Sequence, residues 1–475
     1  MKKITKYIKA GLLLLVLSLQ VSCDESFIEL APISNANVNS FYKSPADFET
    51  AIMGVYNQWQ SVYNTRWTEY NEFRADTYTH VQYSYYEIAE NIFTLNTTAG
   101  FWNELYKVIT FSNIILDRIE GVEFENSSDK DRIKAEAAFF RAEAYFALVR
   151  FFGPVPLIVH ETNSKDALKV GRTPVTTIFD QIEEDYLYAV ANLPTTIDPS
   201  EYGRISKFGA QGELARVYVT LSGAVYNEDR WSDAVPLLED VLFNSPFDFA
   251  DTYEEIFAED GSGEKGKEVV LSAVFKAGGE GEASNYNRQF VGRYGGHPVF
   301  ENGVYESFET DDVRRDINIA LDYISLEGAL ITETTNVKFD WGYDIGTGTS
   351  GLDFPILRYT DAYLLYAEAK AEIAGNVPTE SLDILNKVRT RAGLTALTTT
   401  DIPNLNSFRT AMQKERRSEL MFECVRWFDM VRTGTAVEIL TDLGKPADNT
   451  WLLFPIPQIE IDIIGKSVLP QNLGY

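Results

Sequence analysis

The sequence is poor in cysteine and histidine, and this scarcity limits the chemistry that the protein can perform. Its 475 residues include two cysteines, Cys23 and Cys424, and three histidines. Two cysteines cannot form a disulfide framework, and three histidines leave little room for a histidine-rich metal site. We therefore predict no metal-ligating residues; no calcium loop with the proper spacing is visible, and a structural calcium stays an open alternative. Without disulfides, the fold must be stabilised by a large hydrophobic core. Hydrophobic residues make up 45% of the chain and can form such a core.

Positive charge is also scarce. The chain has 42 lysines and arginines against 70 aspartates and glutamates, which gives a formal net charge of −28. Such a surface repels nucleic acid, so we expect no nucleic-acid partner. The sequence also lacks GxSxG, HExxH and a nucleotide-binding glycine loop. We accordingly predict no cofactor, no catalytic residues and no enzymatic activity.

Long apolar runs are missing, and the longest one lies near the start of the chain. Leu12 to Leu19 form an apolar core after a lysine-rich start, and small Ser22 follows before Cys23. A membrane-spanning helix needs about 20 apolar residues, and this core is far shorter. The order of basic, apolar and small residues is that of an export signal.

The same segment resembles a bacterial lipoprotein signal, in which the cysteine is acylated and becomes the new N-terminus. The resemblance implies a signal peptide over residues 1–22 and lipidation of Cys23, so that acyl chains hold the protein on a membrane surface. The acidic Asp24-Glu25 pair resembles surface-export signals of Bacteroidetes lipoproteins. An ordinary cleaved signal with an incidental cysteine is the alternative.

Several segments have apolar and small residues at helical spacing, and each is followed by a second helical segment. Pro or Gly closes each pair, and alanine and glycine allow the paired helices to approach closely. The pattern resembles tetratricopeptide repeats, in which one helix pair cannot bury its own apolar face. A generic helical domain without repeat ancestry is the alternative. The predicted pairs are 48–60 with 100–121, 131–153 with 175–194, 209–223 with 230–246, and 361–376 with 379–394.

The region from about 250 to 355 has a different composition. It is rich in Gly, Asn, Asp and aromatic residues, and its strand-like runs at 268–275 and 329–339 are short. Long ordered loops on a helical scaffold tend to carry function. We therefore predict a mostly α fold, a tetratricopeptide-like scaffold with an irregular, loop-rich C-terminal part that contains short strands.

Six signatures in order resemble the SusD/RagB family of nutrient-binding outer-membrane lipoproteins of Bacteroidetes. They are WNELYKVITFSNIIL, AEAAFFRAEAYFALVRFFGPVPLI, FPILRYTDAYLLYAEAKAE, VRTRAGL, ERRSELMFECVRWFDMVRTG and the terminal LLFPIPQIEI…LPQNLGY. The resemblance implies an N-terminal helical region over 23–250 and a C-terminal region over 251–475, packed as one body. It also implies an outward-facing, lipid-anchored protein of the outer membrane. Such a protein acts as a lid on a SusC-like TonB-dependent transporter and delivers nutrient to it.

The ERRSELMFECVRWFDMVRTG signature contains charges that could be mistaken for a catalytic cluster. On a helix, Glu415, Glu419 and Glu423 are spaced four apart. Buried carboxylates need arginine partners, and we predict a structural network in which Arg416, Arg426 and Arg432 supply them. A carboxylate pair for acid–base catalysis is the alternative. We expect Phe422, Trp427 and Phe428 to belong to the core.

Two stretches have aromatic residues that fit no helical period, 66–87 and 285–298 with 340–344. Flat rings stack on the apolar faces of sugars, and polar neighbours hydrogen-bond the hydroxyls; the same mixture serves extended peptides. We predict a ligand surface from residues of both stretches: Trp67, Tyr70, Arg74, Asp76, Tyr78, His80, Tyr83, Tyr85, Asn285, Tyr286, Arg293, Tyr294, Trp341 and Tyr343.

Three kinds of function fit these observations. The favoured one is a surface protein that binds an oligosaccharide, with a peptide as the alternative ligand. A glycoside hydrolase needs two carboxylates about 5–9.5 Å apart, and 70 acidic residues produce such pairs by chance. A pure protein-interaction scaffold is the third.

Overall fold

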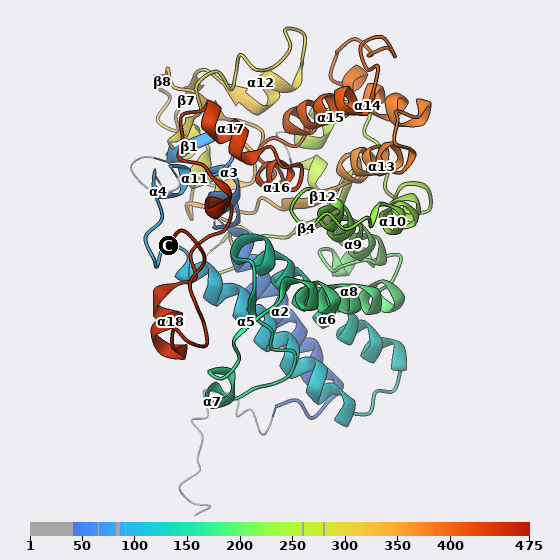
Figure 1. Ribbon diagram of the computed structural model, residues 1–475, viewed down its shortest axis with the longest axis vertical. Coiled ribbons are helices and arrows are strands. Elements are labelled where there is room, and N and C mark those ends of the chain that lie inside the picture. Colours follow the sequence, from blue (N-terminus) through green and yellow to red (C-terminus); the bar gives the residue numbers. More distant parts are fainter. Residues whose placement is uncertain (1–40, 65, 82–85, 91, 259–260, 279–280) are drawn as a thin grey trace, which may run out of the picture.

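The computed structural model describes residues 41–475 except 65, 82–85, 91, 259–260 and 279–280 (Figure 1). The predicted signal peptide and Cys23 lie outside the described residues. None of the helices within the described ranges is both long and apolar enough to span a bilayer.

Paired helices form most of the molecule, and they stack one pair on the next (Figure 1). All four predicted pairs are confirmed. Between pairs, α5 packs against α6, α8 against α9 and α10 against α13. The pairs are α2 (Pro45–Asn64) with α5 (Ala99–Arg118), α6 (Ser127–Phe152) with α8 (Val175–Asn192), α9 (Lys207–Ser222) with α10 (Trp231–Phe243), and α13 (Tyr359–Ala374) with α14 (Thr379–Arg391).

Helix α6 illustrates why these residues form the scaffold. The Asn126 side chain accepts the Ser128 N–H at its start, and Gly153, at φ 71°, ends it before Pro154. From residue 135 to 152 every side chain is buried, because α2, α5 and α8 all pack against this helix. The alanines of the sequence pattern therefore serve close packing on several sides.

Shorter helices and strands complete the chain. The remaining α-helices are α3 (Arg66–Glu72), α4 (Tyr86–Ala89), α7 (Ser164–Ala167), α11 (Tyr286–Phe290), α12 (Arg314–Asn318), α15 (Leu405–Glu419), α16 (Arg426–Arg432), α17 (Ala436–Asp442) and α18 (Gln458–Ile464).

All described sheets are antiparallel pairs: β1 (Tyr78–Val81) with β5 (Pro298–Phe300), β2 (Val155–Pro156) with β3 (Arg172–Thr173), β4 (Val269–Ala273) with β12 (Phe354–Arg358), β6 (Ile319–Ala320) with β9 (Thr335–Asn336), β7 (Tyr323–Ile324) with β8 (Leu330–Ile331), and β10 (Tyr343–Asp344) with β11 (Thr349–Ser350).

The two predicted strand-like runs have different outcomes. The run 268–275 forms β4, which pairs with β12 and lies next to the helical scaffold. The run 329–339 divides into β8 and β9, which pair with different partners, β7 and β6. Its residues therefore build two separate hairpin-like contacts rather than one strand.

The ERRSELMFECVRWFDMVRTG segment is not one continuous helix. Helix α15 ends at Glu419 and α16 begins at Arg426, and Glu423 lies in the turn between them. Phe422 and Cys424 in this turn have φ of 68° and 63°, a left-handed conformation that residues with a side chain rarely adopt. The placement of Glu423 on the same helix as Glu415 and Glu419 was therefore wrong. Phe422 is fully buried, and its packing stabilises the left-handed backbone conformation that ends the helix.

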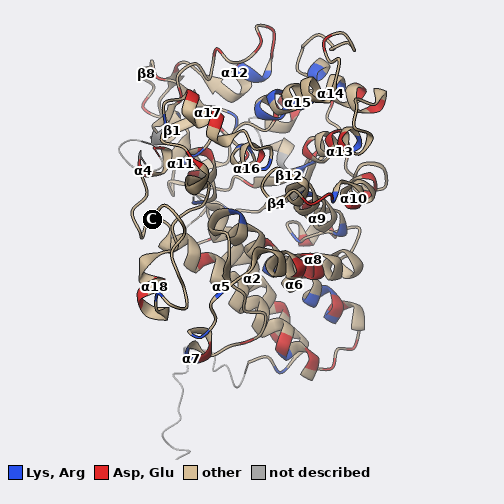
Figure 2. Cartoon of the chain, viewed as in Figure 1, with Lys and Arg blue, Asp and Glu red and all other residues tan. Residues whose placement is uncertain are grey.

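The charges of this segment do form a structural network, as predicted, but all the predicted pairings are wrong. Glu415 pairs with Arg314 at 2.6 Å, and Glu419 and Glu423 pair with Arg358 at 3.0 and 2.7 Å. The three arginines of the segment instead bind other carboxylates: Arg416 binds Asp361 and Asp429, Arg426 binds Asp76, and Arg432 binds Glu368 and Asp429. Figure 2 shows acidic and basic residues next to one another on α13, α14 and α15.

Contacts cross the predicted boundary at residue 250. Arg216 of α9 pairs with Asp361 of α13 at 2.6 Å, and Arg417 of α15 pairs with Asp76 at 2.9 Å. The C-terminal tail docks on α6, since the Asn472 side chain donates to the Phe152 carbonyl at 3.0 Å. The division into two regions stays a prediction.

Candidate functional site

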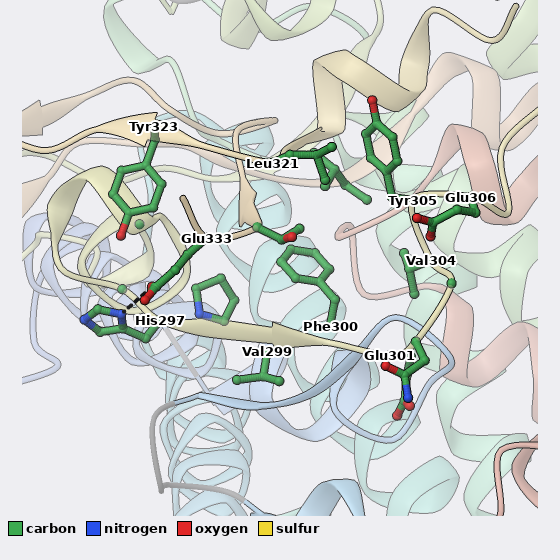
Figure 3. Close-up of a pocket in the computed structure, with 17 residues that line it drawn as sticks. His297, Val299, Phe300, Glu301, Val304, Tyr305, Glu306, Leu321, Tyr323 and Glu333 are labelled. Carbon is green, nitrogen blue, oxygen red and sulfur yellow. Dashed lines mark ion pairs between the residues drawn. The ribbon is translucent and has the colours of Figure 1, made fainter. Parts of the chain in front are cut away.

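An open groove of about 730 Å³ lies in the loop-rich region, between β5 and the segments around β6, β7 and β9 (Figure 3). This size is within the range of ligand sites. Aromatic, aliphatic and acidic side chains share its surface, and Figure 3 shows Tyr323 and Tyr305 at opposite ends of the labelled set, with Phe300 between them. The lining residues are Gly292, Gly296, His297, Pro298, Val299, Phe300, Glu301, Asn302, Gly303, Val304, Tyr305, Glu306, Ile319, Leu321, Tyr323, Glu333 and Thr334.

Strand β5 forms one wall of the groove and is held by β1. Tyr78 pairs with Phe300, and the backbone of His80 pairs with Val299. The Tyr78 ring lies 4.9 Å from the Phe300 ring, so the wall rests on the core. The two stretches from which the sequence predicts a ligand surface are thus adjacent at this wall.

A short 3-10 helix, η7 (Gly292–Tyr294), positions the Tyr323 end of the groove. The Gly292 N–H donates to the Thr335 hydroxyl at 2.7 Å. A Cβ on Gly292 would come within 2.6 Å of the Tyr323 ring. Glycine at this position therefore lets the ring lie flat against the backbone.

The tyrosines at the two ends are half-buried, so part of each ring remains accessible. The Tyr305 hydroxyl donates to Asp316 at 2.7 Å, and this hydrogen bond raises the pKa of Tyr305. Burial, with the nearby charge of Glu333, raises the pKa of Tyr323. Both rings therefore stay neutral at physiological pH and can stack on an apolar ligand face.

The charged residues that line the groove are acidic, apart from one histidine. Glu301 is largely buried and paired with Lys445. Glu333 lies 3.5 Å from His297, and the Glu333 side chain is 60% exposed. Glu306 is exposed. Within the described residues, no three His, Cys, Asp or Glu side chains are arranged to hold a metal.

Four of the predicted ligand residues are half-buried or exposed. Tyr294 and Tyr343 stack with ring centroids 4.2 Å apart, and both are half-buried. Arg293, which is exposed, lies 3.3 Å from Asp340. Burial and a hydrogen bond to Asp340 raise the pKa of Tyr294. Asn285 is exposed, and its backbone N–H donates to Asn64.

Five predicted aromatic residues are in the core, and for them the placement on a ligand surface is corrected. None is more than 7% exposed, because each is enclosed by other rings and aliphatic side chains. Trp67, for example, lies among Phe101, Phe151 and Phe428. These residues are Trp67, Tyr70, Tyr78, Tyr286 and Trp341.

Arg74 and Asp76 are also structural. Arg74 is fully buried, donates to the Trp451 and Leu452 carbonyls, and stacks on Trp427 at 3.9 Å. Burial lowers its pKa to about 9. Burial alone would raise the pKa of Asp76, but its ion pairs with two arginines outweigh this and lower it. Neither side chain is available to a ligand.

The remaining predicted residues cannot be placed. Tyr83 and Tyr85 lie outside the described residues, and of His80 only the backbone is described. Tyr305, Tyr323 and Phe300 are not among the ligand residues predicted from the sequence. The two tyrosines could have been predicted, since they lie in the loop-rich stretch 250–355 and fit no helical period.

The stacked helix pairs and the open groove on irregular loops define a helical-repeat scaffold with a groove on its loop-rich face. Comparison with known proteins identifies the family. Residues 327–475 match the model described as "SusD family", and residues 26–219 match one described as "Starch-binding associating with outer membrane". The chain belongs to the SusD/RagB family, as its signatures predict.

Relatives match over most of their length. SusD-like protein P25 of Formosa agariphila is 24% identical, with 96% of this chain and 97% of that protein covered. A SusD-like protein of Bacteroides ovatus is 27% identical, with 90% and 82% covered. A "laminarin binding SusD-like protein" superposes with a TM-score of 0.79 at 23% identity, covering 91% of this chain and all of the other. A crystal structure with xylogluco-oligosaccharide superposes with a TM-score of 0.72 at 22% identity, covering 90% and 100%.

Proposed function

We propose that this protein is an outer-membrane surface lipoprotein that binds an oligosaccharide nutrient in the groove and does not cleave it. The observation that carries the proposal is the open groove of about 730 Å³ with accessible tyrosines at its ends, on a scaffold of the SusD/RagB family. An open groove with spaced aromatic rings suits a chain of sugar units, each of which has an apolar face.

The relatives support a glycan as the ligand. One protein of the same fold is described as laminarin-binding and another was crystallised with xylogluco-oligosaccharide. The model that matches residues 26–219 is described as starch-binding. A peptide remains the alternative ligand, because the same rings and amide groups also accommodate an extended backbone.

Incubation of the purified protein with a panel of oligosaccharides and peptides tests the proposal. We expect calorimetric binding of at least one oligosaccharide, and chromatography that returns it unchanged. Binding of peptides alone would favour the alternative ligand. Release of shorter sugars would instead indicate a glycoside hydrolase.

The attachment to the membrane rests on the sequence around Cys23. A Cys23→Ala variant should leave the membrane fraction and appear in the soluble fraction, because the acylated residue is removed. Unchanged membrane retention, with the variant expressed at the normal level, would contradict the anchor. Protease accessibility on intact cells tests whether the protein faces outward.

We also propose that the protein delivers its ligand to a SusC-like TonB-dependent transporter and acts as its lid. Exposed apolar side chains on α18 supply a surface for a protein partner: Ile459 and Ile463, four residues apart, are 49% and 56% exposed. Leu95, whose carbonyl accepts the Gln458 N–H at 2.8 Å, extends this surface.

Co-purification of the transporter from native membranes tests this surface. The double change Ile459→Asp and Ile463→Asp should reduce the amount of transporter recovered and leave oligosaccharide binding intact. Phe243→Asp is the control, since Phe243 is 61% exposed and belongs to α10, on the other side of Figure 1 from α18. Equal recovery with both variants would reject α18 as the contact.

A further inference from the structure

We infer that the groove selects neutral oligosaccharides over acidic ones such as uronates and sulfated sugars. This inference rests on the proposed function, and it concerns the charge that a ligand meets once it is in the groove. It is carried by the carboxylates that line the groove and by the absence of any Lys or Arg among the lining residues that the structure describes.

Two of the three lining carboxylates are exposed to an incoming ligand. Glu306 lies at the Tyr305 end and Glu333 at the Tyr323 end (Figure 3). Glu333 lies 3.5 Å from His297, and its side chain is 60% exposed, so it still faces an incoming ligand. A ligand that spans both tyrosines therefore passes both carboxylates.

Three cations close to the groove have carboxylate partners. Arg293, which is exposed, lies 3.3 Å from Asp340. Lys445 is buried against Glu301, so this pair adds no net charge. Arg315 lies over the Tyr305 ring, 4.9 Å from its centroid, and is paired with Asp316 at 2.9 Å. Each cation has its own carboxylate, and the charges of Glu306 and Glu333 remain.

A negative ligand group in this groove meets like charges at short range. Like charges repel, and they repel more strongly where protein displaces the water between them. A uronate or sulfate near one of the two glutamates should therefore bind about tenfold more weakly than the matching neutral sugar. The neutral hydroxyls of the same sugar can donate hydrogen bonds to both carboxylates.

The test uses one sugar chain in three forms. A neutral laminari- or xylogluco-oligosaccharide that binds the full-length protein is compared with its derivative in which primary hydroxyls are oxidised to carboxylates, and with the methyl ester of that derivative. Charge repulsion predicts that the oxidised form binds about tenfold more weakly and that the ester recovers most of the loss. The difference should shrink at about 1 M salt, where the screening length is about 3 Å.

Charge-neutral variants locate the effect. Glu306→Gln and Glu333→Gln should each raise the affinity for the oxidised form, relative to the affinity for the neutral form, about threefold. Glu125→Gln, in the exposed connection between α5 and α6, is the matched control and should change neither.

The outcomes separate this inference from the proposed function. If the oxidised form binds as tightly as the neutral one, or if its weaker binding is insensitive to the ester, to salt and to both Gln variants, the inference is overturned and the proposed function stands. If no oligosaccharide of any charge binds, the proposed function fails first.

Discussion

The helical scaffold and the loop-rich face use the same residue types in opposite ways. In the scaffold, Arg358 is fully buried and binds Glu419 and Glu423, and the aromatic rings pack on one another. At the groove, Glu306 is exposed and Tyr305 is only half-buried. The difference shows that burial and pairing, more than residue type, decide whether a carboxylate or a ring stabilises the fold or remains available to a ligand.

A substitution in the buried charge network should lower the stability of the protein most. Arg358 donates to Glu268, Glu419 and Glu423, so Arg358→Met leaves buried carboxylates short of a counter-charge. We expect the free energy of unfolding, measured by urea denaturation, to fall by about 4 kcal/mol. Arg409→Gln removes a pair between Glu372 and the Arg409 side chain, which is 47% exposed, and should cost less, about 1 kcal/mol. Equal losses from the two variants would contradict the structural role of the buried network.

Trp341 and Tyr343 lie two positions apart in the chain but differ in burial. Trp341 is 6% exposed and lies 5.5 Å from the Phe339 ring, whereas Tyr343 is half-buried and stacks on Tyr294. Trp341→Ala should lower the free energy of unfolding by about 3 kcal/mol, because it opens a cavity in the core. Tyr343→Ala should lower it by less than about 1 kcal/mol. Thermal and urea unfolding of both variants measure the difference; a stable Trp341→Ala protein would show that this ring is not part of the core.

Acid should weaken the scaffold through its paired carboxylates. Burial alone would raise the pKa of Asp429, but Arg416 and Arg432 outweigh it and lower the pKa to about 2, from 3.8. Because the folded-state pKa is the lower one, the stabilisation is complete above pH 3.8 and is lost as pH falls towards 2. The expected loss is about 2 kcal/mol from this residue. Urea unfolding between pH 5 and pH 2 checks it, and unchanged stability over this range would count against the pairing.

The smallest change in free energy is expected on the ligand side. Tyr305→Ala and Tyr323→Ala should each weaken oligosaccharide binding about tenfold, since a stacked ring contributes about 0.5–1.5 kcal/mol beyond its buried area. Stability should change little, because both rings are half-buried. Calorimetric titration measures the affinity, and Tyr343→Ala tests whether its ring pair with Tyr294 contributes. Unchanged affinity in both groove variants would show that the ligand does not stack on these rings.

The sequence predicts the scaffold far better than the site. Ala137 and Ala144 of α6, at helical spacing, are buried as predicted, because a helix pair must cover such a stripe. Aromatic composition alone could not separate Trp67, enclosed by three rings, from Tyr305 at the surface. The groove also depends on contacts between distant positions, such as Glu301 with Lys445, and no local pattern specifies them.

We expect the ligand to bind between the tyrosines of the groove. A hydrogen-exchange experiment tests this most directly. Amide exchange of the full-length protein would be compared with and without the tightest-binding neutral oligosaccharide. We expect slower exchange in peptides that cover 292–306 and 319–334, with the helices α6, α8 and α9 unchanged. Protection confined to other segments, with these two unaffected, would contradict it.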